Sequence, residues 1–189
     1  MIEALSIERA LVLSLTAFVG AVAFSDVRER RIPNALVFPA AVLGLSLNAL
    51  TGLNGLTQGA IGLAAGFALL FLSYLFGGMR AGDVKFFAAI GAFTGGPQVL
   101  RIFFLTLLCY PLLAFFFVTR EHKWEITILR FRILLLKLLG NFVPALTLSA
   151  VRLEADDDLK VESVRTPFSL AIAMGTLLAL STRFLAYLL

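Results

Sequence analysis

Two aspartates, Asp26 and Asp83, each stand where an uncharged apolar stretch meets a short basic segment. Residues 10–25 carry no charged side chain, and neither do the 48 residues of the segment 32–79. Two carboxyl groups that meet can hydrolyse a peptide, because an ionised one takes a proton from water while its protonated partner hydrogen-bonds the scissile carbonyl. That chemistry requires both side chains on the same side of the apolar stretch between them.

The length of segment 32–79 predicts that they are on the same side. A helix rises about 1.5 Å per residue, so roughly 20 residues cross a hydrocarbon core about 30 Å thick. The segment therefore holds two crossings, separated by the Thr-Gly-Leu-Asn-Gly turn at residues 51–55. Because an even number of crossings returns the chain to the side it left, Asp26 and Asp83 should share one face.

The composition excludes an ordinary soluble domain. The chain is 60% hydrophobic and 15% charged, with a mean hydropathy of +0.95, which predicts a single polytopic domain over residues 1–189 in a lipid bilayer. The net charge of +4 is too small to indicate a nucleic-acid partner. A lone Cys109 in an apolar stretch excludes an internal disulfide and a multi-cysteine zinc site, so we expect a buried hydrophobe there and no metal or cofactor.

The predicted fold is all-α, because charge-poor stretches near 20 residues long recur and none alternates with period two. About six transmembrane helices are expected, over residues 7–25, 34–51, 56–77, 84–97, 98–119 and 167–187. The first is expected to be retained rather than cleaved as a signal peptide, because no cationic region precedes it.

The distribution of basic residues predicts the orientation. With these spans, 13 of the 16 Lys and Arg residues fall on one face, and Arg9, Arg101 and Arg183 fall on or toward the other. The positive-inside rule makes the rich face cytoplasmic. We therefore expect a multi-pass protein of the cell (inner) membrane, with its amino terminus outside and both aspartates facing the cytoplasm.

The fourth predicted span is too short to cross a membrane alone. Counting Asp83 itself, only 12 residues precede the Gly-Gly-Pro break at residues 95–97, which is about 18 Å of helix. Such a helix must begin below the membrane surface or lean on its neighbours. The loop 77–82 would then lie at membrane depth, where protein or water has to surround it.

The segment 119–166 is predicted to be cytoplasmic or interfacial. Arg130, Arg132 and Lys137 interrupt its apolar residues, which favours an amphipathic interfacial helix with a re-entrant tail. A seventh span over residues 133–151 is the alternative, and it would leave both aspartates in place. The three aspartates at 156–158 are typical of a solvated loop.

Structural roles compete with catalysis at both acids. Asp83 follows Gly82 and opens a predicted helix, so it could be an N-cap. Asp26 lies at the carboxyl end of the first helix, where the macrodipole disfavours a negative charge, so a functional role is favoured over a salt bridge to Arg28. No rival machinery is present, because His122 is the only histidine and neither H-E-x-x-H nor G-x-S-x-G occurs.

Three segments together carry a family resemblance: Ser-Asp-Val-Arg-Glu-Arg-Arg-Ile-Pro-Asn at 25–34, Ala-Gly-Asp-Val-Lys at 81–85 and Pro-Phe-Ser-Leu-Ala-Ile-Ala-Met-Gly at 167–175. The chain resembles the type IV prepilin peptidases, which are intramembrane aspartic proteases of the G-x-G-D class. The resemblance implies that Asp26 and Asp83 are catalytic. It implies as substrate a pilin-like or pseudopilin precursor whose short basic leader is removed at the cytoplasmic face.

The other polar or flexible residues of these motifs are candidates for holding the unwound substrate or shaping the site: Asn34, Gly82 and Lys85. Lys85 has a second interpretation, in which its ammonium group extends to the lipid headgroups.

The chain departs from the family pattern at Arg80, which replaces the first motif glycine and would be costly if a positive φ were needed there. The four-cysteine segment of the longer, methylating members is not found, so the chain resembles the short peptidase-only branch of Flp- or Tad-type pilus systems. A catalytically impaired scaffold of a pilus or secretion apparatus is the alternative. The sequence does not indicate an oligomeric state.

Overall fold

The computed structural model describes residues 2–75, 79–120, 128 and 168–188, with side chains described for 6–75, 79–120, 128 and 168–182. Most of the predicted interfacial segment 119–166, including the alternative span 133–151 and the aspartates 156–158, lies outside the described residues.

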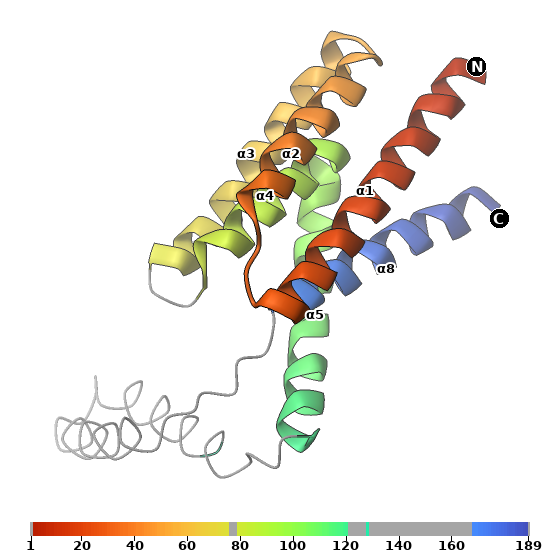
Figure 1. The fold of residues 1–189 in the computed structure, drawn as a ribbon. Coiled ribbons are helices and arrows are strands. Elements are labelled where there is room, and N and C mark those ends of the chain that lie inside the picture. Colours follow the sequence, from red (N-terminus) through yellow and green to blue (C-terminus); the bar gives the residue numbers. More distant parts are fainter. Residues whose placement is uncertain (1, 76–78, 121–127, 129–167, 189) are drawn as a thin grey trace, which may run out of the picture. The chain divides into compact units, whose positions relative to one another are not determined.

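Every element in the described part of the chain is a helix (Figure 1). The elements are α1 (Ile2–Glu29), α2 (Asn34–Ala49), α3 (Leu53–Leu75), α4 (Ala81–Thr94), α5 (Gly96–Arg120) and α8 (Phe168–Leu188). The prediction of an all-α fold is confirmed. Among the described residues, three helices are long and apolar enough to cross a membrane: Ser6–Glu29, Leu53–Leu75 and Gly96–Arg120. Asn34–Ala49 and Phe168–Thr182 are shorter apolar helices.

The chain forms two compact units. One contains Met1–Tyr110 and Pro167–Leu189, and the other contains Pro111–Thr166. The boundary falls at Pro111 inside α5, where the missing N–H removes one helical hydrogen bond. All contacts described below lie within the first unit.

Local backbone chemistry ends the helices close to the predicted positions. Arg30 follows α1 in the left-handed region, with φ 53°, and its N–H donates to the carbonyl of Asp26 at 2.8 Å. Gly52 (φ 102°) makes the turn between α2 and α3, and Gly95 (φ 80°) ends α4. At the last two positions the positive φ favours glycine, which has no Cβ to clash.

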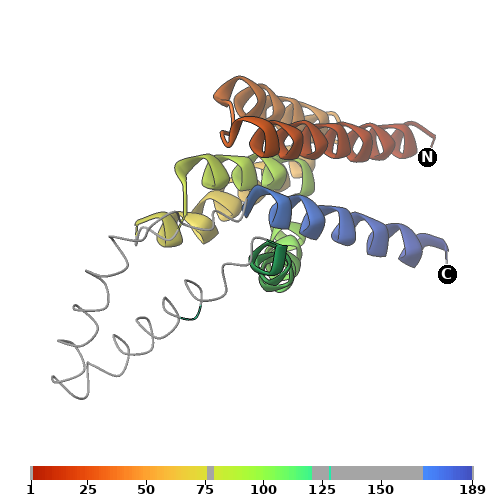
Figure 2. The same ribbon diagram turned by 60° about the horizontal axis from the view of Figure 1, so that its bottom comes forward.

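Helix α4 is buried on nearly all sides. It packs on α2 and α3 and also contacts α1 and α8 (Figures 1 and 2). Its buried residues are Asp83, Val84, Phe86, Phe87, Ala88, Ala89, Ile90, Gly91, Ala92 and Phe93. At 14 residues it is about 21 Å long, less than a hydrocarbon core of about 30 Å. The helix therefore depends on its neighbours, as its short span predicts.

Small and polar residues hold α4 in place. A Cβ built on Gly62 of α3 would overlap the carbonyl oxygen of Gly91 in α4, and one on Gly91 would overlap that of Gly62. Such contact requires two glycines, as in close helix pairs of membrane proteins. At the carboxyl end of α4, the Asn48 amide of α2 donates to the carbonyls of Ala92 (2.8 Å) and Phe93 (3.1 Å), which have no partner within the helix.

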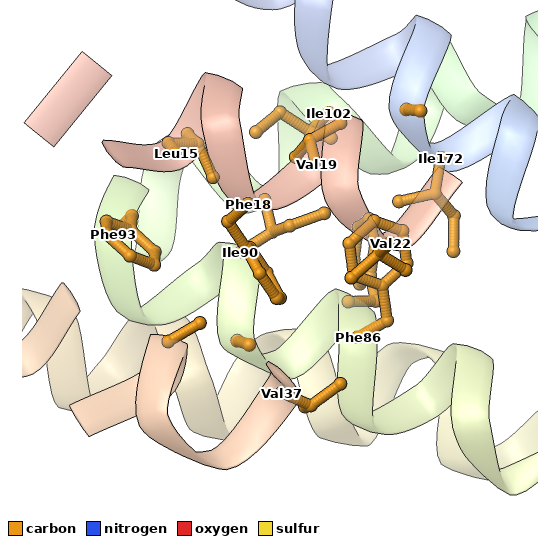
Figure 3. Packing of buried hydrophobic residues seen from close by; sticks show 14 of the residues in the cluster. Leu15, Phe18, Val19, Val22, Val37, Phe86, Ile90, Phe93, Ile102 and Ile172 are labelled. Atoms are coloured by element: carbon orange, nitrogen blue, oxygen red, sulfur yellow. The ribbon is translucent and has the colours of Figure 1, made fainter. Parts of the chain in front are cut away.

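Apolar side chains join α1 to α4 next to the amino end of α4. Figure 3 shows Phe18 and Val22 of α1 lying against Phe86 and Ile90 of α4, with Ile172 of α8 beside them. The Phe18 and Phe86 ring centroids are 5.4 Å apart in an edge-on arrangement, which is favourable for aromatic pairs. This packing fixes the spacing of the helix ends that carry the two aspartates.

Candidate active site

Asp26 is buried near the carboxyl end of α1, with 6% of its surface exposed. The hydroxyl of Ser169, which is fully buried, donates a hydrogen bond to Asp26 Oδ2. Ser169 is the second residue of α8, so the amino end of α8 meets the carboxyl end of α1 (Figure 1). The free N–H groups and positive dipole at that end offset the unfavourable dipole of α1. The bonded partner of this carboxylate is thus Ser169 rather than Arg28, which is exposed.

Asp83 is the third residue of α4 and is also 6% exposed. The structural alternative in which Asp83 is the N-cap does not hold, because the cap residue is Arg80 and the helix begins at Ala81. The N–H of Asp83 donates to the Arg80 carbonyl at 3.1 Å, and the Asp83 carboxylate accepts a hydrogen bond from the Arg80 N–H. This return bond is one half of a capping box and holds the carboxylate at the helix start.

The two acids interact electrostatically. Asp83 lies outside the three helices that are long enough to span a membrane. Burial, followed by the negative charge of Asp26, raises the pKa of Asp83 to about 6, against the opposing effects of the Arg80 N–H and the Arg80 charge. The structure therefore brings together the two carboxyl groups singled out in the sequence. Like charges in a buried place do not both ionise readily, so the negative charge of Asp26 favours the protonated form of Asp83.

Arg80 fits the position of the missing motif glycine. Its backbone is extended, with φ −91° and ψ 148°, a conformation open to any residue. Its Nη1 donates to the carbonyl of Arg30 at 3.2 Å. Arg80 therefore connects the segment before Asp83 to the segment after Asp26, without the backbone cost that the sequence suggested.

The three further candidate residues lie beside this region. The Lys85 ammonium donates to Asn34 Oδ1 at 3.3 Å and lies 5.5 Å from the centroid of the Phe38 ring, a cation–π contact. Gly82 packs against Ile32, because a Cβ on Gly82 would lie 3.3 Å from the Ile32 Cβ. Asn34 and Lys85 are thus paired with each other, and Gly82 lets the start of α4 approach the loop after α1. Their roles toward a substrate remain predictions.

Other polar groups bear on the chemistry less directly. Cys109 is buried at 4% exposure, as expected for a small apolar residue. Within the residues that the structure describes, no three His, Cys, Asp or Glu side chains form a group that could hold a metal ion.

Sequence reasoning missed the contact of Ser169 with Asp26. The segment 167–175 was part of the family resemblance, but nothing in it indicated which side chain would reach Asp26. The available signal was a serine at the start of a helix, where no earlier turn of the same helix offers its hydroxyl a carbonyl.

Comparison with known proteins identifies the family. The profile described as the type IV leader peptidase family matches residues 13–117, a range that contains both aspartates. The chain belongs to this family. The prepilin leader peptidase/N-methyltransferase of Neisseria gonorrhoeae is 33% identical to it over 103 residues, covering 51% of this chain and 36% of that protein. The match thus spans about a third of the relative's length, and no solved structure matches.

Proposed function

We propose that this member of the type IV leader peptidase family is a membrane-embedded aspartic endopeptidase. It removes the short basic leader from a type IV pilin-like or pseudopilin precursor at the cytoplasmic face. Family membership supports a peptidase that processes leader peptides. The observation that carries the aspartic mechanism is the pair of buried carboxyl groups, in which the charge of Asp26 acts on Asp83.

The pair supports direct attack by water. With one proton shared between Asp26 and Asp83, the ionised group deprotonates water and the protonated group hydrogen-bonds the peptide carbonyl. The product is a tetrahedral intermediate, and no covalent acyl-enzyme forms. Burial strengthens both interactions because the local dielectric is low.

The substrate must be extended at the cleaved bond. In a helix the peptide carbonyl accepts a backbone hydrogen bond and is shielded from water. A precursor with a basic leader and an apolar helix would pack that helix laterally against the membrane spans, while the bond to be cut unwinds near Asp83. Asn34, Gly82 and Lys85 are the residues proposed to hold or shape the unwound strand.

The proposal is tested with membranes that contain this protein and a leader-bearing pilin precursor. Cleavage is read as a mobility shift on a gel. Asp26→Asn and Asp83→Asn should each abolish cleavage while the protein remains in the membrane. Glu29→Gln is the matched control, because Glu29 is an exposed acid at the same end of α1, and it should cleave normally.

Two results would count against the proposal. Full processing of the precursor by either asparagine variant would contradict the aspartic mechanism. A wild-type protein that accumulates in the membrane and never cleaves any leader-bearing pilin would favour the scaffold alternative.

A further inference from the structure

The hydrogen bond from Ser169 differs from that of Thr176, the other buried hydroxyl residue in the described side chains of α8. Thr176, which is also fully buried, donates to the carbonyl of Ile172 in its own helix at 2.7 Å, the usual solution for a helical threonine. Ser169 is the second residue of α8, so no residue of that helix lies four positions before it. Its hydroxyl crosses to another helix and donates to Asp26 Oδ2.

The start of α8 is held firmly enough to position that hydroxyl. The ring of Phe168 meets the ring of Tyr110 edge-on at 5.1 Å between centroids. Further along α8, a Cβ on Gly175 would lie 2.5 Å from Thr106 Oγ1, so α8 and α5 are in close contact there. Both contacts are made with α5, which supports the first two turns of α8. A side chain held on a supported helix can impose a geometry on the group that it touches.

We propose that Ser169 is a positioning residue that holds Asp26 as the ionised member of the pair, so that Asp26 is the base and Asp83 is the protonated partner. This inference rests on the proposed aspartic mechanism. A hydrogen bond donated to a carboxylate stabilises its ionised form, and the amino end of α8 acts in the same direction.

The surroundings of Asp83 favour its role as the protonated partner. Its pKa is raised to about 6, mainly by burial and then by the charge of Asp26, while Arg80 opposes the shift. The packed helices α2 and α3 carry no charged side chain, nor do residues 168–182 of α8. On α1 the charged neighbours of Asp26 are Arg28 and Glu29, which are exposed, and on α4 Lys85 bonds Asn34.

The assigned roles balance the protons. Asp26 takes a proton from water as the water oxygen bonds to the carbonyl carbon, and Asp83 gives its proton to the carbonyl oxygen. When the C–N bond breaks, the leaving amine takes the proton held by Asp26. Asp83 recovers its own proton from a hydroxyl of the intermediate as the carboxyl group forms, so the pair returns to its starting state.

The test compares four variants of the full chain with a leader-bearing pilin precursor, using kcat and KM. Ser169→Ala should lower kcat about tenfold to a hundredfold, the range for a lost hydrogen bond to a charged group, with KM little changed. Ser169→Thr keeps the hydroxyl and should restore most of kcat. Ser169→Cys keeps the size with a weaker donor and should be intermediate. Thr176→Ala, the matched control, should retain wild-type kcat.

The pH profile separates positioning from simple packing. Loss of the donor should move the acidic limb of kcat to higher pH, because that limb reports ionisation of the base. A packing defect would lower kcat at every pH alike.

Several outcomes would overturn the inference. These are wild-type kcat in Ser169→Ala, an effect confined to KM, an equal loss in Thr176→Ala, or an unshifted acidic limb. If Ser169→Ala does not accumulate in the membrane, wild-type kcat in Ser169→Cys overturns it instead. Normal activity of Asp26→Asn would mean that the aspartic mechanism itself has failed, whereas an inactive Asp26→Asn with an unaffected Ser169→Ala would reject only the role of Ser169.

Discussion

Each aspartate has a local interaction that makes its buried position tolerable. Asp26 accepts a hydrogen bond from Ser169, and Asp83 accepts one from the N–H of Arg80. The sequence alone points to both acids as candidate site residues, because a charge at the boundary of an apolar stretch is costly without a function. It does not point to Ser169, because Ser169 lies 143 residues from Asp26 in the chain and the contact depends on how α1 and α8 pack.

The raised pKa of Asp83 gives a pH dependence with a definite sign. Its pKa moves from 3.8 to about 6 on folding, so the folded protein binds this proton more tightly than the unfolded chain does. The stability from this group is full below pH about 4 and is lost as the pH rises through about 6. In the proposed mechanism Asp83 loses its catalytic proton over the same range, so cleavage should fall on the alkaline side with an apparent pKa near 6. A flat single-turnover profile from pH about 4 to about 8, with chemistry limiting, would contradict this.

Restoring the motif glycine should change little. Arg80→Gly removes one exposed hydrogen bond to Arg30, a contact of about 1 kcal/mol or less, and φ at this position is −91°. We expect cleavage within about fivefold of wild type, and an alkaline limb at higher pH because the positive charge is gone. A much larger gain in activity would show that arginine impairs this site.

At the scale of the elements, the sequence predicts roughly where the helices begin and end. It does not predict which helices pack against one another. The second span was predicted over 34–51 and α2 is Asn34–Ala49; the fourth was predicted over 84–97 and α4 is Ala81–Thr94. Helix α4 begins earlier than predicted, with Arg80 at the cap position and its N–H bonded to the Asp83 carboxylate. Gly95 (φ 80°) ends the helix. That α4 is the buried centre depends on glycine contacts with α3, which no local pattern specifies.

Those glycines give a stability prediction. Gly62→Ala would place a Cβ onto the Gly91 carbonyl oxygen, forcing α3 and α4 apart at a cost of about 1–3 kcal/mol or more. The variant should unfold at a lower temperature in detergent and cleave more slowly. Gly20→Ala is the control, because nothing lies within 4 Å of a Cβ there and alanine favours a helix by about 1 kcal/mol. Equal melting temperatures for the two variants would refute the close contact.

At the scale of the whole molecule, the arrangement is that of a membrane protein of the type IV leader peptidase family. Its orientation in the membrane is a prediction from the charge distribution. The two acid-bearing helix ends in α1 and α4 should face the cytoplasm, and the turn between α2 and α3 should face the other side.

Accessible cysteines can test this orientation. Arg28→Cys and Ala81→Cys, both at exposed positions, should be labelled by an impermeant thiol reagent only from the cytoplasmic side. Cys109 is buried and is changed to alanine in the background. Thr51→Cys in the turn after α2, also exposed, should show the opposite pattern. Labelling of positions 28 and 81 in intact cells would show that the orientation is the reverse of the predicted one.

The central claim is that Asp26 and Asp83 act as one catalytic unit. Single-turnover cleavage of a pilin precursor by Asp26→Asn, Asp83→Asn and the double variant tests it most directly. Each single variant should lose about a thousandfold or more, and the double variant should lose no more than the worse single one, because residues that act as a unit are not additive. A single variant that cleaves at the wild-type rate, or a double variant whose loss is the product of the two, would contradict the claim.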